Sequence, residues 1–172
     1  MHCRPERLPV SAPGRAWVYG DDINTDLLAP AAYLKGSMED LASHCLEDLD
    51  ANFAATVREG DVFVAGANLG IGSSREQAPQ ALHILGIRTI LAKSFGRIFY
   101  RNALNLGIPT LVCPQADRVR SGDRLRIDAS AGVVHNLNTG EDLSCEPLPD
   151  HLLEMVGDGG LIPHLKKKLS GS

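Results

Sequence analysis

A turn-forming run joins a predicted strand to a predicted helix: Gly66-Ala67-Asn68-Leu69-Gly70-Ile71-Gly72-Ser73-Ser74-Arg75-Glu76. Its three glycines allow a tight backbone path, and two hydroxyls, a guanidinium and a carboxylate follow at once. Residues 61–65 before it, an aspartate followed by four apolar residues, predict a strand, and residues 78–85 after it predict a helix. We therefore expect this glycine run, residues 66–76, to carry whatever chemistry the chain performs.

Two similar helix-to-strand units follow the glycine run. The phrases Leu85-Gly86-Ile87-Arg88-Thr89-Ile90-Leu91 and Leu106-Gly107-Ile108-Pro109-Thr110-Leu111-Val112 each place a glycine just past a predicted helix, where a C-cap belongs. They lead from helices predicted over 78–85 and 98–106 into strands predicted over 89–92 and 110–113. Such repeated units predict parallel strands.

Short runs over 124–128, 132–136 and 142–145 follow Pro114, and the turn-forming Ala-Gly and Asn-Thr-Gly sequences between them predict an antiparallel meander. A strand at 16–19, a helix after Ser37 with Leu41, Cys45, Leu46 and Leu49 on its apolar face, and helices over 150–156 and 161–169 complete the prediction. The expected fold class is α/β, with a mixed parallel and antiparallel sheet or barrel-like core flanked by helices. Residues 1–15, which contain three prolines, are expected to be a flexible leader before a single domain at 16–172.

Composition narrows the function classes. A chain of 172 residues with a net charge of -4 is about one domain long and lacks the basic surface that nucleic-acid binding requires. Its four cysteines, at positions 3, 45, 113 and 145, include no CxxC pair and predict reduced thiols in the cytoplasm. His83 and Arg88 interrupt the apolar run at 82–91 too early for a membrane span, and residues 1–15 hold no secretory segment.

The glycine run allows three interpretations. A phosphate cradle is opposed by the absence of lysine before Ser73 and of an acid after the strand at 89–92. A capping box of Ser73 and Glu76 is opposed by Pro79, which favours a helix that begins near Glu76 or Gln77. The third is an anion-binding catalytic turn, because backbone N–H groups and the Arg75 guanidinium would stabilise a serine alkoxide.

Three segments together resemble the small-subunit family of 3-isopropylmalate dehydratase, in the aconitase superfamily. They are Gly20-Asp21-Asp22-Ile23-Asn24-Thr25-Asp26, Gly70-Ile71-Gly72-Ser73-Ser74-Arg75-Glu76-Gln77-Ala78-Pro79 and Ala92-Lys93-Ser94-Phe95-Gly96-Arg97-Ile98-Phe99-Tyr100-Arg101-Asn102-Ala103. The resemblance extends from about Gly14 to Leu169 and implies a swivelling β/β/α domain. It also implies a hydro-lyase of leucine biosynthesis, which isomerises 2-isopropylmalate to 3-isopropylmalate by dehydration and rehydration.

The family pattern implies roles for residues in the glycine run. Ser73 would be the catalytic base, Ser74 would support it, and Arg75 would bind a substrate carboxylate, for which a planar guanidinium is suited. A [4Fe-4S] cluster would be held by a large partner subunit, since thiolates usually bind such a cluster through a CxxC pair that this chain lacks. The chain alone is therefore expected to bind no metal and to be inactive and colourless.

Flanking segments acquire supporting roles from the same resemblance. Asp22, Thr25 and Asp26 match an early loop that faces the large subunit near the active site. This loop is too rich in short polar side chains to be predicted as helix or strand, and a solvated turn is the alternative interpretation.

Residues on two further segments complete the predicted site. Leu34 and Lys35 match a loop that closes over the variable part of the substrate, although a surface lysine beside a core leucine has the same pattern. We expect residues 33–52 to be mobile in the isolated chain. Ser94 and Arg97 belong to the third segment and are expected to brace the catalytic turn, with an ordinary ion pair as the alternative for Arg97.

The chain departs from the family pattern beside the site. Leu69, Ile71 and Gln77 stand where closely related chains are expected to have phenylalanine, cysteine and histidine. None of these changes removes the base or the guanidinium, but they leave the side group of the substrate open. Homoaconitate, a methylated malate or another 2-hydroxy diacid stays as an alternative substrate, and a stand-alone phosphate- or anion-binding regulatory module stays as an alternative function.

Overall fold

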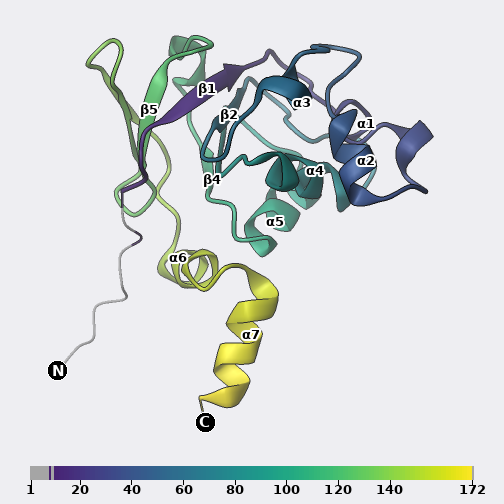
Figure 1. Ribbon diagram of the computed structural model, residues 1–172. Helices are drawn as coiled ribbons and strands as arrows, with labels where there is room; N and C mark the ends of the chain where they lie inside the picture. Colours follow the sequence, from purple (N-terminus) through teal and green to yellow (C-terminus); the bar gives the residue numbers. More distant parts are fainter. Residues whose placement is uncertain (1–7, 9, 172) are drawn as a thin grey trace, which may run out of the picture.

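One seven-stranded sheet forms the centre of the molecule in the computed structural model, which describes Leu8 and residues 10–171 (Figure 1). The strand order is β4-β3-β2-β1-β5-β6-β7. The strands are β1 (Gly14–Val18), β2 (Val62–Ala65), β3 (Thr89–Ala92), β4 (Thr110–Val112), β5 (Arg124–Asp128), β6 (Val133–Asn136) and β7 (Asp142–Ser144). Strands β1 to β4 pair in parallel, and β1 with β5, β5 with β6 and β6 with β7 pair antiparallel, so the predicted mixed sheet is confirmed.

The parallel strands are buried on both faces, which explains why they read as continuous apolar runs. In β2, Val62 and Val64 belong to one hydrophobic core, whereas Phe63 and Ala65 belong to the other. This separation follows from the two-residue side-chain period of a strand. One core is covered by the helices between β1 and β4, and the other lies between the sheet, the meander of β5 to β7 and helix α6.

Seven α-helices and two 3-10 turns surround the sheet within the described residues. They are α1 (Thr25–Leu28), η1 (Ala31–Tyr33), α2 (Met38–Ser43), α3 (Phe53–Thr56), α4 (Gln77–Leu85), α5 (Arg97–Asn105), η2 (Ala116–Arg118), α6 (Asp150–Gly157) and α7 (Leu161–Ser170). Helix α4 begins at Gln77, as predicted, so Pro79 lies in a first turn whose N–H groups need no intrahelical partner. Gly86 ends α4 with a φ of 107°, which confirms the predicted glycine cap.

The two edges of the sheet approach each other. Just after β7, the N–H of Glu146 donates to the carbonyl of Val112 at the end of β4, with an N···O distance of 2.9 Å. The sheet is therefore curled into a half barrel, which agrees with the predicted barrel-like core. The hydrophobic cluster enclosed by this curl joins Leu111 of β4 to Leu125 and Val134 of β5 and β6, which are distant from β4 in sheet order.

The predicted domain boundary at residue 16 falls inside β1. Gly14 and Arg15 pair with Leu125 and Arg124 of β5, and the Ser11 amide donates to the carbonyl of Ile127 at 2.9 Å. These backbone bonds incorporate residues 11–15 into the sheet. The predicted flexibility of the leader falls on residues 1–7 and 9, which lie outside the described residues.

Two local predictions before β2 are corrected by the structure. Thr25 and Asp26, predicted as turn, begin the short helix α1, because Asn24 caps it by accepting the Leu27 N–H at 2.8 Å. The helix after Ser37 ends at Ser43, and Leu46 adopts a φ of 62°. This break moves Leu49 out of the predicted apolar face, and its side chain is 49% exposed.

The segment at 33–52 is only partly anchored. Leu41, Cys45 and Leu46 are buried in the core next to α4, as predicted, whereas most residues between 35 and 40 are exposed. Mobility in the isolated chain therefore stays a prediction for the exposed half of this segment. Figure 1 shows α7 extending from the body beyond α6. Among the described residues, none of the helices combines the length and the apolar character needed to cross a bilayer.

Candidate active site

The three polar segments singled out in the sequence meet at one edge of the sheet. Strands β1, β2 and β3 run parallel, so the loops that leave their carboxyl ends emerge side by side. These loops are residues 20–26, the glycine run at 66–76 and residues 93–96. The glycine run therefore lies between the two segments that were expected to support it.

Hydrogen bonds from both neighbouring loops fix the glycine run. On one side, the Asp21 carboxylate accepts the Ala67 N–H at 2.8 Å. On the other, the Ser94 hydroxyl oxygen accepts the Asn68 N–H at 2.8 Å. Asp22 accepts a further bond from the Asn68 side-chain amide at 2.9 Å. The early loop is thus held against the glycine run of its own chain, and the predicted supporting contact of Ser94 is present.

Gly70 and Thr25 bring the catalytic turn close to α1 and α5. Gly70 has a φ of 82°, and a β-carbon at this position would overlap the ring of Phe99. Its N–H donates to the Ile23 carbonyl at 2.7 Å, and the Thr25 N–H donates to the Ile71 carbonyl at 3.0 Å. Thr25 is 2% exposed and lies beneath the turn, where it supports the backbone.

Ser73 and Ser74 are exposed at the tip of the turn. Within the described part of the chain, the structure records no hydrogen-bond partner for either hydroxyl. The Ser73 carbonyl accepts the Arg75 N–H at 2.8 Å, which closes the turn, and Glu76 at the helix N-cap accepts no side-chain capping bond. The capping-box interpretation of Ser73 and Glu76 is therefore wrong, because the helix begins one residue after Glu76. Both hydroxyls remain available to a ligand.

The guanidinium of Arg75 is held in place by hydrogen bonds from one of its nitrogens. Its Nη1 donates to the Asp26 carboxylate at 2.7 Å and to the carbonyl of Ala29 at 3.0 Å. The Arg75 hydrogen bond and the N–H of Ala31 hold the pKa of Asp26 below its ordinary value. Because a guanidinium carries five N–H donors, the Nε and Nη2 edge of Arg75 stays available for a carboxylate. The Arg75 side chain is 20% exposed, so this edge can reach a ligand.

The remaining predicted site residues lie at different distances from the turn. Leu34 is partly buried against the core and Lys35 is exposed, on the segment that begins at Ala31 beside Asp26. Arg97 is exposed at the start of α5, and the structure records neither a contact with the turn nor an ion pair for it within the described residues. The bracing role of Arg97 is therefore not observed.

The described cysteines do not form a cluster-binding set. Cys45 lies in the core on one face of the sheet, whereas Cys113 and Cys145 contact the core on the other face. None of the three lies in the loops that form the site. An iron–sulfur cluster needs several thiolates in one place, so the described residues do not fit such a group.

Sequence reasoning missed the pairing of Asp26 with Arg75 and the contacts of Asn68. The Asp26–Arg75 and Asp22–Asn68 pairs join loops more than forty positions apart, which the parallel pairing of β1 with β2 brings together, and the pairing of β2 with β3 brings Ser94 to Asn68. It also missed Asp61, a buried carboxylate that accepts the Trp17 ring N–H at 2.9 Å. A lone aspartate before an apolar strand carries no local signal of such a partner.

Comparison with known proteins agrees with this geometry. Residues 30–116 match the family described as the aconitase C-terminal domain, which defines the class of this chain. The chain is 46% identical to the 3-isopropylmalate dehydratase small subunit of Nautilia profundicola, with 91% of this chain and 95% of that relative covered. It is 49% identical to the 3-isopropylmalate dehydratase small subunit 1 of Methanopyrus kandleri, with 90% and 92% covered.

A solved structure gives the same result for the fold. The crystal structure of 3-isopropylmalate dehydratase from Methanocaldococcus jannaschii superposes with a TM-score of 0.87 at 42% identity and covers 92% of this chain and 95% of its own. The chain belongs to the family of 3-isopropylmalate dehydratase small subunits. The resemblance drawn from the three sequence segments is confirmed.

Proposed function

We propose that this chain acts as the small subunit of a heteromeric hydro-lyase that isomerises 2-isopropylmalate to 3-isopropylmalate in leucine biosynthesis, in the cytoplasm. The observation that carries the proposal is the exposed Ser73-Ser74-Arg75 turn, in which both hydroxyls are unpaired and one guanidinium edge is open. The names of the relatives support the substrate, and the word subunit in those names supports a larger partner. Homoaconitate and methylated malates stay as alternative substrates.

The residues of the turn suit the proposed reaction. Ser73 Oγ would take the proton from the carbon beside the hydroxyl-bearing carbon, and loss of the hydroxyl would leave an alkene. The hydroxyl, which leaves as hydroxide, would then add to the carbon that lost the proton, while Ser73 would return its proton to the carbon that lost the hydroxyl, so no atom is gained or lost overall. Ser74 and nearby backbone N–H groups would stabilise the alkoxide form of Ser73, which is far too basic without such donors.

Binding of the substrate would use Arg75 and the segment that follows Asp26. Asp26 and the carbonyl of Ala29 fix the plane of the guanidinium, so its open edge can meet both oxygens of one carboxylate. The chain from Ala31 to Lys35 begins at this pair, which supports a contact of Leu34 or Lys35 with the variable part of the substrate.

The iron–sulfur cluster is assigned to the large subunit. Enzymes of the aconitase family depend on such a cluster. The described cysteines lie in two cores on opposite faces of the sheet, which supports a donor set outside this chain. Asp22, Thr25 and Asp26 surround the turn and would form part of the contact with the large subunit.

The test is reconstitution of the full chain with the large subunit of a characterised relative. The wild-type pair should interconvert 2-isopropylmalate and 3-isopropylmalate, and Ser73→Ala should lower kcat by several orders of magnitude. Ser144→Ala is the matched control, because Ser144 is an exposed serine on β7 remote from the turn. Near-normal turnover by Ser73→Ala would exclude this serine as the base. Faster turnover of a different 2-hydroxy diacid would show that this diacid, and not 2-isopropylmalate, is the substrate.

A further inference from the structure

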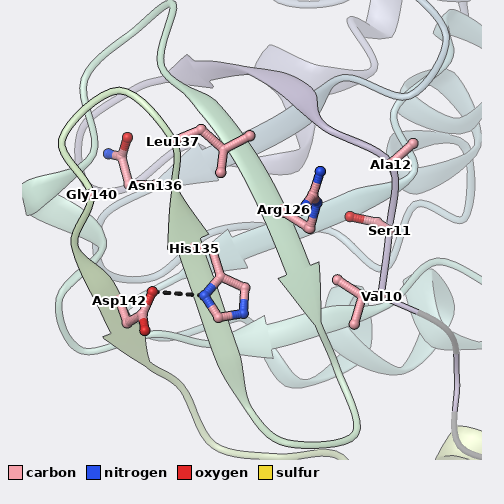
Figure 2. Close-up of a pocket in the computed structure, with 9 residues that line it drawn as sticks. All are labelled: Val10, Ser11, Ala12, Arg126, His135, Asn136, Leu137, Gly140 and Asp142. Atoms are coloured by element: carbon pink, nitrogen blue, oxygen red, sulfur yellow. Dashed lines mark hydrogen bonds and ion pairs between the residues drawn. The ribbon is translucent and has the colours of Figure 1, made fainter.

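A second concave site lies on the antiparallel half of the sheet, away from the catalytic turn. It is a trough of about 900 Å³ that opens between the N-terminal segment and strands β5 to β7. Its lining is shown in Figure 2 and consists of Val10, Ser11, Ala12, Arg126, His135, Asn136, Leu137, Gly140 and Asp142. None of these residues belongs to the loops that form the candidate active site. This volume is within the range of small-molecule sites.

Two nitrogen-bearing side chains lie side by side on the neighbouring strands β5 and β6. Arg126 and His135 are directly paired in the strand register, and His135 is in turn paired with Asp142 of β7. The His135 Nδ1 bonds to the Asp142 carboxylate at 2.7 Å, which turns the Nε2 of the ring away from Asp142 (Figure 2). Asp142 is the one carboxylate among the lining residues, and His135 already engages it.

Arg126 has no carboxylate partner within the described residues. It is exposed on β5, and Figure 2 places its guanidinium beside Ser11. The Ser11 oxygen accepts the Ile127 N–H at 2.9 Å, so the hydroxyl proton remains free to be donated. A permanent cation and a hydroxyl donor therefore line the same trough, and this pair is suited to an anion.

Apolar side chains stand on both sides of these polar groups. Val10 and Leu137 are each 46% exposed, and Figure 2 shows Arg126 between them. A fully hydrated anion such as phosphate would gain nothing from these surfaces, whereas a ligand with an aliphatic part would cover them. The combination favours a molecule that is anionic at one end and aliphatic at the other.

We propose that this trough binds a small aliphatic carboxylate. Its carboxylate would accept bonds from Arg126 and Ser11, and its alkyl group would pack on Val10 and Leu137. The site is independent of the proposed function, since it shares no residue with the Ser73 turn. Its occupant would act as an effector or be carried passively, rather than be transformed there.

Calorimetric titration of the full chain tests the proposal with three probes. These are 3-methylbutanoate, which has both features, acetate, which has only the charge, and 3-methylbutanol, which has only the alkyl chain. We expect 3-methylbutanoate to bind at least about tenfold more tightly than either of the others. No saturable heat with 3-methylbutanoate, or equal affinities for all three probes, would overturn the proposal.

Substitutions locate the bound 3-methylbutanoate on the chain. Arg126→Gln should weaken its binding by at least about tenfold, since a bond to a charged partner is lost. Arg124→Gln is the matched control, because Arg124 is an exposed arginine on the same strand outside the trough lining, and it should leave the affinity unchanged. Equal affinities for the wild type and Arg126→Gln would refute the assignment. Ser73→Ala should bind 3-methylbutanoate like the wild type, and loss of binding in that variant would locate the ligand at the catalytic turn instead.

Discussion

At the scale of single residues, the candidate site depends on how Arg75 divides its donors. One nitrogen of the guanidinium is held by Asp26 and by the Ala29 carbonyl, while no bond to the other two nitrogens is recorded within the described residues. A lysine at this position would keep the charge but offer neither a second edge nor a fixed plane. The carboxylate recognition proposed for Arg75 would therefore depend on the shape of its side chain as well as on its charge.

Arg75→Lys tests this dependence in the reconstituted heteromer. We expect KM for 2-isopropylmalate to rise about 10- to 100-fold, because a two-pronged bond to a carboxylate is replaced by a point charge. Arg97→Lys is the matched control, since Arg97 is exposed and makes no recorded contact with the turn. Steady-state kinetics measure both variants. Equal effects of the two substitutions would argue against a special role for Arg75.

At the scale of elements, the close packing of the glycine run on α5 decides where the turn lies. Gly70 combines a left-handed backbone with contact to the Phe99 ring. A side chain there would be disfavoured both by the backbone conformation and by overlap with this ring. Gly70→Ala should lower the free energy of unfolding by about 2–4 kcal/mol. Gly20→Ala should change it little, because a β-carbon at Gly20 would meet no atom within 4 Å. Urea denaturation measures both, and similar midpoints would show that the turn can relax.

The same scale shows what the sequence could and could not predict. The strands β2, β3 and β4 were predictable because both faces are buried, and the glycine after α4 marked the helix end. The break at Leu46 was not, because it depends on a bond to a distant segment, from the Leu46 N–H to the Leu27 carbonyl at 2.9 Å. Helix α1 was missed because its short polar residues are typical of a turn, whereas here the Asn24 side chain caps a helix. For the site, Ser73 and Arg75 stood out by residue type, whereas the Asp26 partner of Arg75 required the fold.

At the scale of the whole molecule, the sheet separates Cys45 from Cys113 and Cys145, which are hydrogen-bonded to each other. Cys45 packs among α2 and its neighbours on one face, and Cys113 and Cys145 lie on the other. Treatment of the purified chain with ferrous iron, sulfide and a thiol should therefore leave it colourless and without stoichiometric iron after gel filtration. Iron analysis and visible absorption measure this outcome, with the large subunit treated in parallel as the positive control. Cluster absorption retained by this chain alone would place the donor set within it.

The joint between α6 and α7 extends the fold beyond the half barrel. Asp158, at the end of α6, accepts bonds from the His164 Nδ1 at 2.7 Å and from the Lys167 Nζ at 3.0 Å. The His164 hydrogen bond, followed by that of Lys167, holds the pKa of Asp158 below its ordinary value of 3.8. A carboxyl whose pKa is lower in the folded state than in the unfolded state stabilises the fold while it is ionised.

This linkage gives a pH-dependent prediction for the attachment of α7. Asp158→Asn should lower the free energy of unfolding and speed amide hydrogen exchange in α7 at neutral pH, since the charged acceptor is lost. The stabilisation from Asp158 is fully present at pH values above the ordinary pKa of 3.8. It is lost as the pH falls through the lower pKa that the carboxyl has in the folded state. The difference in the free energy of unfolding between wild type and Asp158→Asn should therefore shrink in that acidic range.

The control is Asp150→Asn, at an exposed carboxylate on α6 with no recorded partner among the described residues. It should differ less from the wild type at neutral pH. A difference between wild type and Asp158→Asn that stays constant down to the lowest pH would mean that the charge of Asp158 does not hold α7 in place.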